Sequence, residues 1–256
     1  MAKISELKRI NQVLAALVVI LALVLGITLA QQNNWIKTPS KQINAPAERT
    51  YTSEAINLPT PRKISSTSVE AALQSRRSKR SYDEESLTLQ QVSQLLWSAQ
   101  GVTTNWGGRT APSAKSAYPI ELSLVAKNVE DLDPGVYHYL PENHQIRQTI
   151  SEIPEKYNEA AVQQSGQSSP IAIVVSANYQ RMTDAFEGEV NDDNVLLEAG
   201  HVGQNFYLQV ESLRLGMVVV GGFNRNLMQE TLQIPSSEQL IYLIPVGNPS
   251  ETQTPH

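Results

Sequence analysis

The chain has 256 residues, of which 41% are hydrophobic, and it carries 20 Lys and Arg against 25 Asp and Glu, for a net charge of −5. This apolar share excludes a wholly disordered protein, and the acidic balance argues against nucleic acid as a partner, because phosphate contacts need clustered cations. The chain has no cysteine, which excludes disulfides, thiolate metal sites, a cysteine nucleophile and a lipid-modified cysteine anchor.

Residues 13–30 form an uninterrupted apolar stretch, VLAALVVILALVLGITLA. Eighteen helical residues span about 27 Å, enough for the hydrocarbon core of a bilayer. Lys3, Lys8 and Arg9 precede the stretch, so the positive-inside rule predicts a cytoplasmic N-terminus over residues 1–12 and an extracytoplasmic remainder. An uncleaved transmembrane helix is favoured. A cleaved signal peptide, which would give a secreted or periplasmic protein, and a buried core helix are the alternatives.

Residues 31–68 are polar and contain four prolines. Prolines at this density oppose helices and central strands, so the segment is predicted to be an extended, proline-rich linker. The folded domain is then expected over residues 69–247, and residues 248–256 are expected to be a disordered tail.

Hydrophobic periodicity within the domain predicts five helices, over residues 69–75, 89–100, 152–164, 195–215 and 225–232. Short apolar or alternating runs predict five strands, over residues 120–126, 135–139, 170–176, 217–220 and 240–246. Ser86 or Thr88 would cap the second helix, and Asn224 the last. Because helices and strands do not alternate regularly, the predicted class is α+β, or an irregular three-layer α/β arrangement.

The sequence lacks the motifs of serine hydrolases, nucleotide-binding loops and zinc proteases. Its four histidines share no metal-ligand spacing, so no metal site and no catalytic side chain is predicted. Two stretches remain as candidates for ligand binding.

The first candidate stretch, Arg76-Arg77-Ser78-Lys79-Arg80, groups four cations around a hydroxyl. If it is extended, Arg76, Ser78 and Arg80 point the same way and suit a phosphate. The second stretch, residues 109–119 (RTAPSAKSAYP), is rich in small residues that let the backbone approach a flat ligand. A solvated basic patch and an ordinary surface loop are the alternatives.

Several segments in a fixed order carry a resemblance to a known family. They are RRSKRSY (76–82), LTLQQVSQLLWSAQGVT (87–103), RTAPSAKSAYPIEL (109–122), GVYHY (135–139), EAGHVGQNFYLQVESLRLGMVVVGGF (198–223) and YLIPVG (242–247). With them the chain resembles the nitroreductase superfamily of FMN-dependent oxidoreductases, and especially its SagB-type dehydrogenase branch. The resemblance implies a mixed sheet flanked by helices, and an obligate homodimer with two FMN sites at its interface.

The resemblance also implies flavin-binding roles for nine residues. Arg76 and Ser78 match contacts to the FMN phosphate and ribityl chain, with Arg77 beside them. Arg80 matches a cation near the pyrimidine edge of the ring. The loop that reaches the flavin from the partner subunit corresponds to Pro112, Ser113 and Ala114, and the turn whose backbone packs on the ring corresponds to Gly221 and Gly222.

The chain departs from the family at two points. Lys115 stands where the family has glycine, and no Lys or Arg follows Val246 to contact the phosphate. We also expect the long helix to form the homodimer interface around Gly203 and Phe206, because glycines let two helices approach closely.

The implied activity is ping-pong hydride and electron transfer through bound FMN, between a small-molecule substrate and NAD(P)H, a quinone or oxygen. A domain outside the cytoplasm has no access to NAD(P)H, which favours substrate oxidation with electrons passed to oxygen or a quinone. A membrane-tethered flavin domain fed through the bilayer would also accommodate this location. The alternative is a flavin-binding module without turnover, acting as a sensor or assembly factor, which the two departures from the family would suit.

Overall fold

The computed structural model describes residues 14, 17–18, 20–21, 44–189 and 192–250. The predicted transmembrane segment lies mostly outside them, and among these residues no helix has the length and apolarity needed to cross a bilayer. The chain divides into two units, residues 1–42 and 43–256, and the second contains the folded domain.

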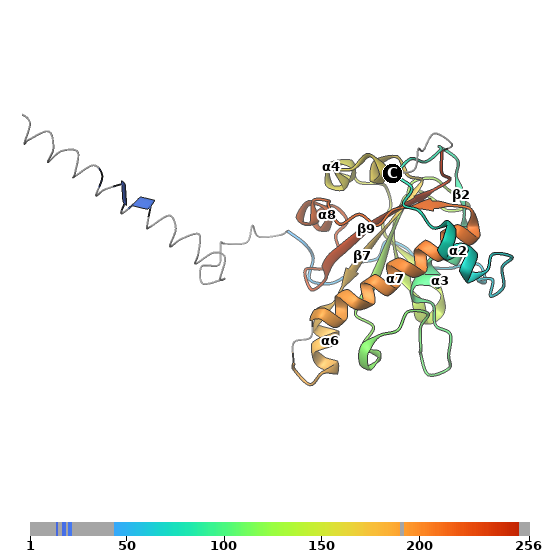
Figure 1. Ribbon diagram of the computed structural model, residues 1–256, viewed down its shortest axis with the longest axis horizontal. Coiled ribbons are helices and arrows are strands. Elements are labelled where there is room, and N and C mark those ends of the chain that lie inside the picture. Colours follow the sequence, from blue (N-terminus) through green and yellow to red (C-terminus); the bar gives the residue numbers. More distant parts are fainter. Residues whose placement is uncertain (1–13, 15–16, 19, 22–43, 190–191, 251–256) are drawn as a thin grey trace, which may run out of the picture. The chain divides into compact units, whose positions relative to one another are not determined.

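A seven-stranded sheet forms the centre of this domain, in the order β1-β6-β5-β3-β7-β9-β8 (Figure 1). Its strands are β1 (Ala55–Asn57), β3 (Ile120–Ala126), β5 (Gly135–Leu140), β6 (Gln145–Ile150), β7 (Ile171–Ala177), β8 (Gly216–Met217) and β9 (Gln239–Gly247). All neighbouring strands in it are antiparallel, so the expectation of a mixed sheet is wrong. One reason for the antiparallel pairing is that only a short segment connects β5 to β6, whereas parallel neighbours need a long crossover connection. A separate parallel pair joins β2 (Leu87–Thr88) to β4 (Val129–Glu130).

Helices cover both faces of the sheet and produce three layers (Figure 1). They are α2 (Val69–Ser75), α3 (Leu89–Gln100), α4 (Tyr157–Ala161), α5 (Gln164–Ser168), α6 (Tyr179–Ala185), α7 (Asp192–Leu213) and α8 (Arg225–Thr231), with the 3-10 turns η1 (Ala114–Ser116) and η2 (Pro141–Asn143). Successive side chains of a strand point to opposite faces. Accordingly, Leu124 of β3 packs in the core of α3 and α7, whereas Val125 packs in the core of α4 and α8. The predicted α+β class is confirmed.

Local sequence signals explain several element boundaries. Thr88 begins α3 with a capping box: its hydroxyl accepts from the Gln91 N–H at 3.2 Å, and the Gln91 side chain accepts from the Thr88 N–H at 2.8 Å. The single helix predicted over residues 152–164 is wrong, because the structure has two short helices, α4 and α5, in this region. Val162 adopts a left-handed φ of 63° there, and this ends α4 before α5 begins.

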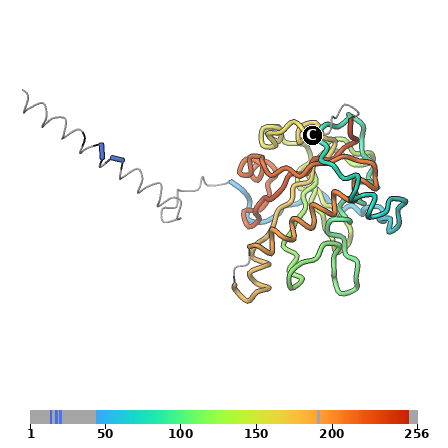
Figure 2. Tube along the Cα trace, viewed as in Figure 1, coloured from blue at the N-terminus to red at the C-terminus, as the bar shows by residue number. Residues whose placement is uncertain are grey.

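Residues 44–68, predicted as part of a linker, belong to the domain instead; we call them the N-terminal arm. In the arm, β1 pairs Ile56 with Ile146 at the sheet edge, and the buried Arg49 side chain lies 2.6 Å from Glu238. Figure 2 follows the arm, blue to teal, across the domain to the start of α2. The prolines are accommodated because β1, the paired part, contains none.

The predicted tail is also partly ordered. The Asp83 N–H donates to the Asn248 carbonyl at 2.9 Å, and Tyr82 forms an antiparallel β-bridge with Pro249. Residues 248–250 therefore belong to the folded domain. Residues 251–256 lie outside the described part of the chain.

Candidate functional site

The Arg76–Arg80 stretch follows α2 and lies against the second half of α7. The Ser78 and Tyr207 hydroxyl oxygens are 2.9 Å apart, and the Arg76 guanidinium lies 5.0 Å from the centre of the Tyr207 ring. Arg76 and Ser78 therefore turn toward the same side chain, as their alternation in an extended segment predicts.

Tyr207 also connects this stretch to the segment that leads into Gly221 and Gly222. The Val219 N–H donates to the Tyr207 hydroxyl at 3.1 Å, and the Lys79 N–H donates to the Met217 carbonyl at 2.8 Å. A Cβ atom added to Gly221 would meet no atom within 4 Å, so open space lies in front of this backbone. The Arg76–Ser78 and Val219–Gly222 segments thus form one cluster, which we call the basic cluster.

Among the described residues, the cations of the basic cluster have no acidic partners. Neither Arg76 nor Arg77 forms an ion pair with a carboxylate within residues 44–189 and 192–250, and Arg80, which follows the cluster in sequence, forms none there either. Arg77 instead donates to the backbone carbonyls of Gln74 and Arg76 at 3.1 and 2.7 Å. Uncompensated guanidinium groups beside a hydroxyl and an open glycine turn suit a phosphate group. The residues present therefore fit the anionic, flat cofactor that the resemblance implies.

The second candidate stretch lies near the other end of α7. Ser113 interacts with Glu198, whereas Ser78 contacts Tyr207, nine residues further along the helix. Nine helical residues correspond to about 13 Å along the axis. In one protomer, Pro112, Ser113 and Ala114 therefore lie apart from the basic cluster, near the other end of α7.

Polar side chains from α3, α7 and the η2 turn form a hydrogen-bond network with the 109–119 stretch. Arg109 donates to Gln100 of α3 at 2.9 Å and pairs with Glu142 at 2.8 Å, and the Gln100 amide donates to Glu198 at 3.4 Å. Burial raises the pKa of Glu198, although hydrogen bonds from Ser113 and Gln100 act in the opposite direction. The Lys115 ammonium group lies 4.5 Å from the centre of the Phe186 ring, at the end of α6.

A cavity of about 390 Å³ lies beside this stretch and contains a second buried acid, Glu121. His138 Nε2 and Arg181 Nη2 lie 2.8 and 2.5 Å from the Glu121 carboxylate. Burial favours the neutral acid, but the hydrogen bond from His138 and the charges of His138 and Arg181 outweigh it and lower the pKa of Glu121 to about 2. Glu121 is therefore ionised at neutral pH, in contrast to the tendency of Glu198.

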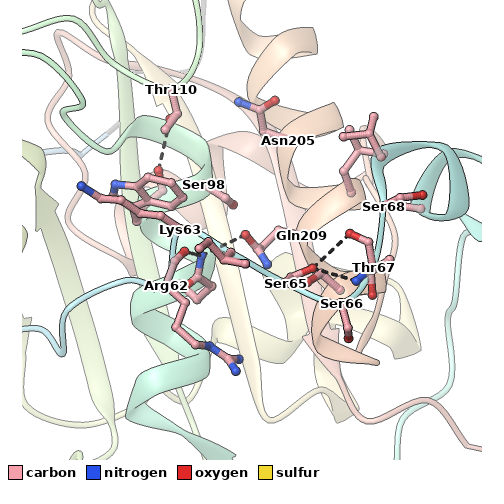
Figure 3. A pocket seen from close by; sticks show the side chains of 17 residues that line it. Arg62, Lys63, Ser65, Ser66, Thr67, Ser68, Ser98, Thr110, Asn205 and Gln209 are labelled. Atoms are coloured by element: carbon pink, nitrogen blue, oxygen red, sulfur yellow. Dashed lines mark hydrogen bonds between the residues drawn. The ribbon is translucent and has the colours of Figure 1, made fainter.

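A groove of about 460 Å³ opens between the N-terminal arm, α3 and α7 (Figure 3). Figure 3 shows Gln209 of α7 reaching toward the arm, where the Gln94 amide donates both to Gln209 Oε1 at 3.1 Å and to the Arg62 carbonyl at 3.0 Å. None of the nine predicted flavin-binding residues lines this groove. It is therefore distinct from the basic cluster.

Sequence reasoning missed two residues and chose two buried residues for the expected dimer interface. Tyr207 and Glu198 are polar groups within the apolar periodicity of α7, and that interruption is the signal that could have identified them. Gly203 and Phe206 are buried against their own domain, so the expectation that they form the dimer interface is wrong. The exposed face of α7 instead carries Leu197, which is 62% exposed, and Gly200.

Comparison with known proteins assigns a family to this geometry. Residues 73–248 match the Nitroreductase family. A nitroreductase-named protein of Methanocaldococcus jannaschii, MJ1384, is 39% identical over 185 residues, which cover 72% of this chain and 92% of that protein. A nitroreductase-named structure from Ralstonia eutropha has a TM-score of 0.67 at 27% identity and covers 84% of this chain and 98% of its own. The NADPH:FMN oxidoreductase of Vibrio harveyi shares the fold, with a TM-score of 0.51 at 19% identity, covering 73% of this chain and 72% of its own.

Proposed function

Because the chain belongs to the nitroreductase family, we propose that it is an FMN-dependent oxidoreductase that works as a homodimer. The observation that carries the proposal is the basic cluster, in which Arg76, Ser78 and the Val219 N–H converge on Tyr207. Among the described residues, no acid pairs with its arginines. The name of the Vibrio harveyi protein that shares the fold, an NADPH:FMN oxidoreductase, supports the choice of cofactor.

Bound FMN would supply the hydride and electron chemistry, so the protein needs to bind, orient and electrostatically adjust it. Arg76 and Ser78, with Arg77 beside them, would hold the phosphate and ribityl chain. Arg80 would stabilise negative charge on the reduced ring, and the backbone at Gly221 and Gly222 would pack against it. The partner protomer would contribute Pro112, Ser113 and Ala114.

We further propose a SagB-type direction for the reaction, in which a small-molecule substrate is oxidised and electrons pass to oxygen or a quinone. The support is the predicted membrane anchor over residues 13–30, which would place the domain outside the cytoplasm and away from NAD(P)H. If the domain is cytoplasmic, NAD(P)H becomes the expected donor and reduction the expected direction.

The absorbance spectrum of the purified protein tests FMN binding directly. We expect a flavin spectrum that bleaches when the substrate or a chemical reductant is added. Charge-assisted hydrogen bonds contribute about 1.5–3 kcal/mol, so Arg76→Ala should weaken FMN binding by roughly ten- to a hundred-fold. Arg62→Ala, which removes an exposed arginine from the N-terminal arm, is the matched control and should bind normally.

Two results would contradict the proposed FMN site. A colourless protein that cannot be reconstituted with FMN excludes flavin binding. A yellow protein whose Arg76→Ala and Arg80→Ala double variant keeps its full flavin content shows that the cofactor binds elsewhere. Flavin that bleaches chemically but turns over no substrate or acceptor would favour the non-catalytic binding module.

A further inference from the structure

Tyr207 lies at the centre of the basic cluster, and the proposed function gives its hydroxyl group no role. The Val219 N–H donates to this hydroxyl oxygen at 3.1 Å, and the Ser78 hydroxyl oxygen lies 2.9 Å from it. The Arg76 guanidinium lies over the ring, 5.0 Å from its centre. The Tyr207 hydroxyl therefore contacts both chain segments that make up the cluster.

The direction of the hydrogen bond between Tyr207 and Ser78 follows from the partners of each hydroxyl group. The Tyr207 oxygen already accepts from the Val219 N–H, so its own proton needs an acceptor. Within the described residues, the Ser78 oxygen is the acceptor that lies within hydrogen-bond distance. A phenol is also more acidic than an aliphatic hydroxyl group and hence the better donor. Tyr207 therefore donates to Ser78.

Ser78 then keeps a proton that it can donate to a ligand. In the part of the chain that the structure describes, the Ser78 hydroxyl has no partner besides Tyr207, and the half-buried Arg76 guanidinium has neither a hydrogen-bond acceptor nor an acid. Hydrogen bonds that run in one direction polarise one another, so the terminal Ser78 proton is a stronger donor than that of an isolated serine. Two unengaged donors beside one ring suit an anion.

The backbone of the Arg76–Arg80 stretch is held without help from the Tyr207 hydroxyl. The Lys79 N–H donates to the Met217 carbonyl at 2.8 Å, and the Lys79 carbonyl accepts from the Tyr82 hydroxyl at 2.7 Å. Removing the Tyr207 hydroxyl should therefore free the serine side chain while the path of the backbone stays the same.

We infer that Tyr207 is a positioning residue for the cofactor phosphate: its hydroxyl group fixes the Ser78 hydroxyl as an acceptor, which leaves the Ser78 proton for the phosphate. The inference rests on the proposed function, in which Arg76 and Ser78 hold the phosphate and ribityl chain of FMN. It adds that the serine serves as a donor and that Tyr207 acts through this serine. Phosphate oxygens are strong acceptors, so a directed donor binds them better than a hydroxyl group that rotates freely.

Tyr207→Phe separates the hydroxyl group from the ring, because phenylalanine keeps an aromatic face beneath Arg76. FMN and riboflavin, which lacks the phosphate, are titrated against the purified full-length protein after its flavin has been removed, and flavin fluorescence gives both dissociation constants. The variant should bind FMN about tenfold more weakly than wild type and riboflavin as wild type does. Tyr51→Phe, which removes a hydrogen-bonded tyrosine hydroxyl from the N-terminal arm, is the matched control and should change neither constant.

Two results in Tyr207→Phe would overturn the inference. Unchanged FMN binding would mean that the hydroxyl group does not serve the phosphate. Equal losses for FMN and riboflavin would mean that Tyr207 acts through the Val219 segment or through the fold as a whole.

A double variant tests whether Tyr207 acts through Ser78, and it decides where riboflavin binds too weakly to titrate. Tyr207→Phe combined with Ser78→Ala should bind FMN no more weakly than Ser78→Ala alone, because the second change removes the group that the first one frees. A further loss of about tenfold in the double variant would show that the two residues act independently and would overturn the inference.

A measurement without flavin separates this inference from the proposed function. If wild type binds no FMN, the proposed function fails, and the thermal stability of the flavin-free protein in inorganic phosphate then decides the role of Tyr207. Phosphate that binds the folded state should raise the melting temperature of wild type above its value in chloride at the same ionic strength. A smaller rise in Tyr207→Phe supports the positioning role, whereas equal rises, or none in wild type, overturn it.

Discussion

Removing the Arg49 guanidinium should destabilise the domain strongly, because this residue ties the N-terminal arm to the sheet. Arg49 Nη2 and Nε lie 2.6 and 3.1 Å from the two oxygens of Glu238, and Nη1 donates to the Ser123 hydroxyl at 3.1 Å. The side chains of Arg49 and Glu238 are 9% and 7% exposed. The substitution Arg49→Met keeps most of the apolar stem and removes the charge.

The size of the effect follows from this burial. In Arg49→Met, Glu238 would keep the Ser176 hydroxyl, at 2.5 Å, but would lose its counter-charge. Leaving one member of a buried pair uncompensated costs about 3–5 kcal/mol. The double variant Arg49→Met with Glu238→Gln removes the stranded charge and should recover part of that loss. For contrast, Glu142→Gln breaks the Arg109 pair, in which Glu142 is 66% exposed, and should cost less than about 1 kcal/mol.

Urea unfolding followed by circular dichroism measures these differences. The midpoint should fall in Arg49→Met while the slope with denaturant stays close to wild type, since the same surface becomes exposed. A loss in Arg49→Met no larger than that in Glu142→Gln would refute the reasoning, as would a double variant less stable than Arg49→Met. The first result would mean that the arm contributes little to the folded state, and the second that the uncompensated charge of Glu238 does not cause the loss.

Three further predictions concern a helix cap, an ionised acid and an exposed helix face. Thr88→Ala removes the capping box of α3 and should cost about 1 kcal/mol in thermal unfolding, whereas Thr88→Ser should cost less. The pKa of Glu121 is lowered to about 2, so its ionised form stabilises the fold above its ordinary pKa of about 4.3, and this stabilisation is lost as the pH falls through 2. Wild type should therefore exceed Glu121→Gln in unfolding free energy by up to about 3 kcal/mol at neutral pH, and equal stability there would contradict the assignment. Leu197→Glu should convert a dimer into a monomer in sedimentation, because it places a charge on the exposed apolar face of α7.

Local patterns in the sequence were sufficient wherever one physical signal dominated. The predicted helices over residues 69–75 and 89–100 and the predicted strand over residues 120–126 agree with α2, α3 and β3 to the residue. Capping residues fix the starts of both helices, and the loosely alternating run IELSLVA fixes the strand. The prediction for residues 152–164 was wrong because nothing in the composition of this segment indicates a positive φ at Val162.

Long-range partners account for what the sequence could not predict. The strand in the N-terminal arm is three residues long and forms by pairing with β6, about ninety positions away, so its own composition does not identify it. The basic cluster was predictable in its cations, which are adjacent in sequence. The role of Tyr207 at its centre was not, because the sequence marks Tyr207 only as a polar group within the apolar periodicity of α7, and the fold alone brings Ser78 and Val219 to its hydroxyl.

The last prediction concerns topology, which decides the electron donor. Residues 13–30 are uncharged and apolar, and cations precede them, so we expect a single anchor with the domain outside the cytoplasm. Protease added to intact cells should then release a fragment that still binds FMN. A domain that is protected until the cells are lysed would reverse the orientation and restore NAD(P)H as the donor. A domain found free in the medium or periplasm with Gln31 as its first residue would identify the segment as a cleaved signal peptide, with oxygen or a soluble acceptor in place of a membrane quinone.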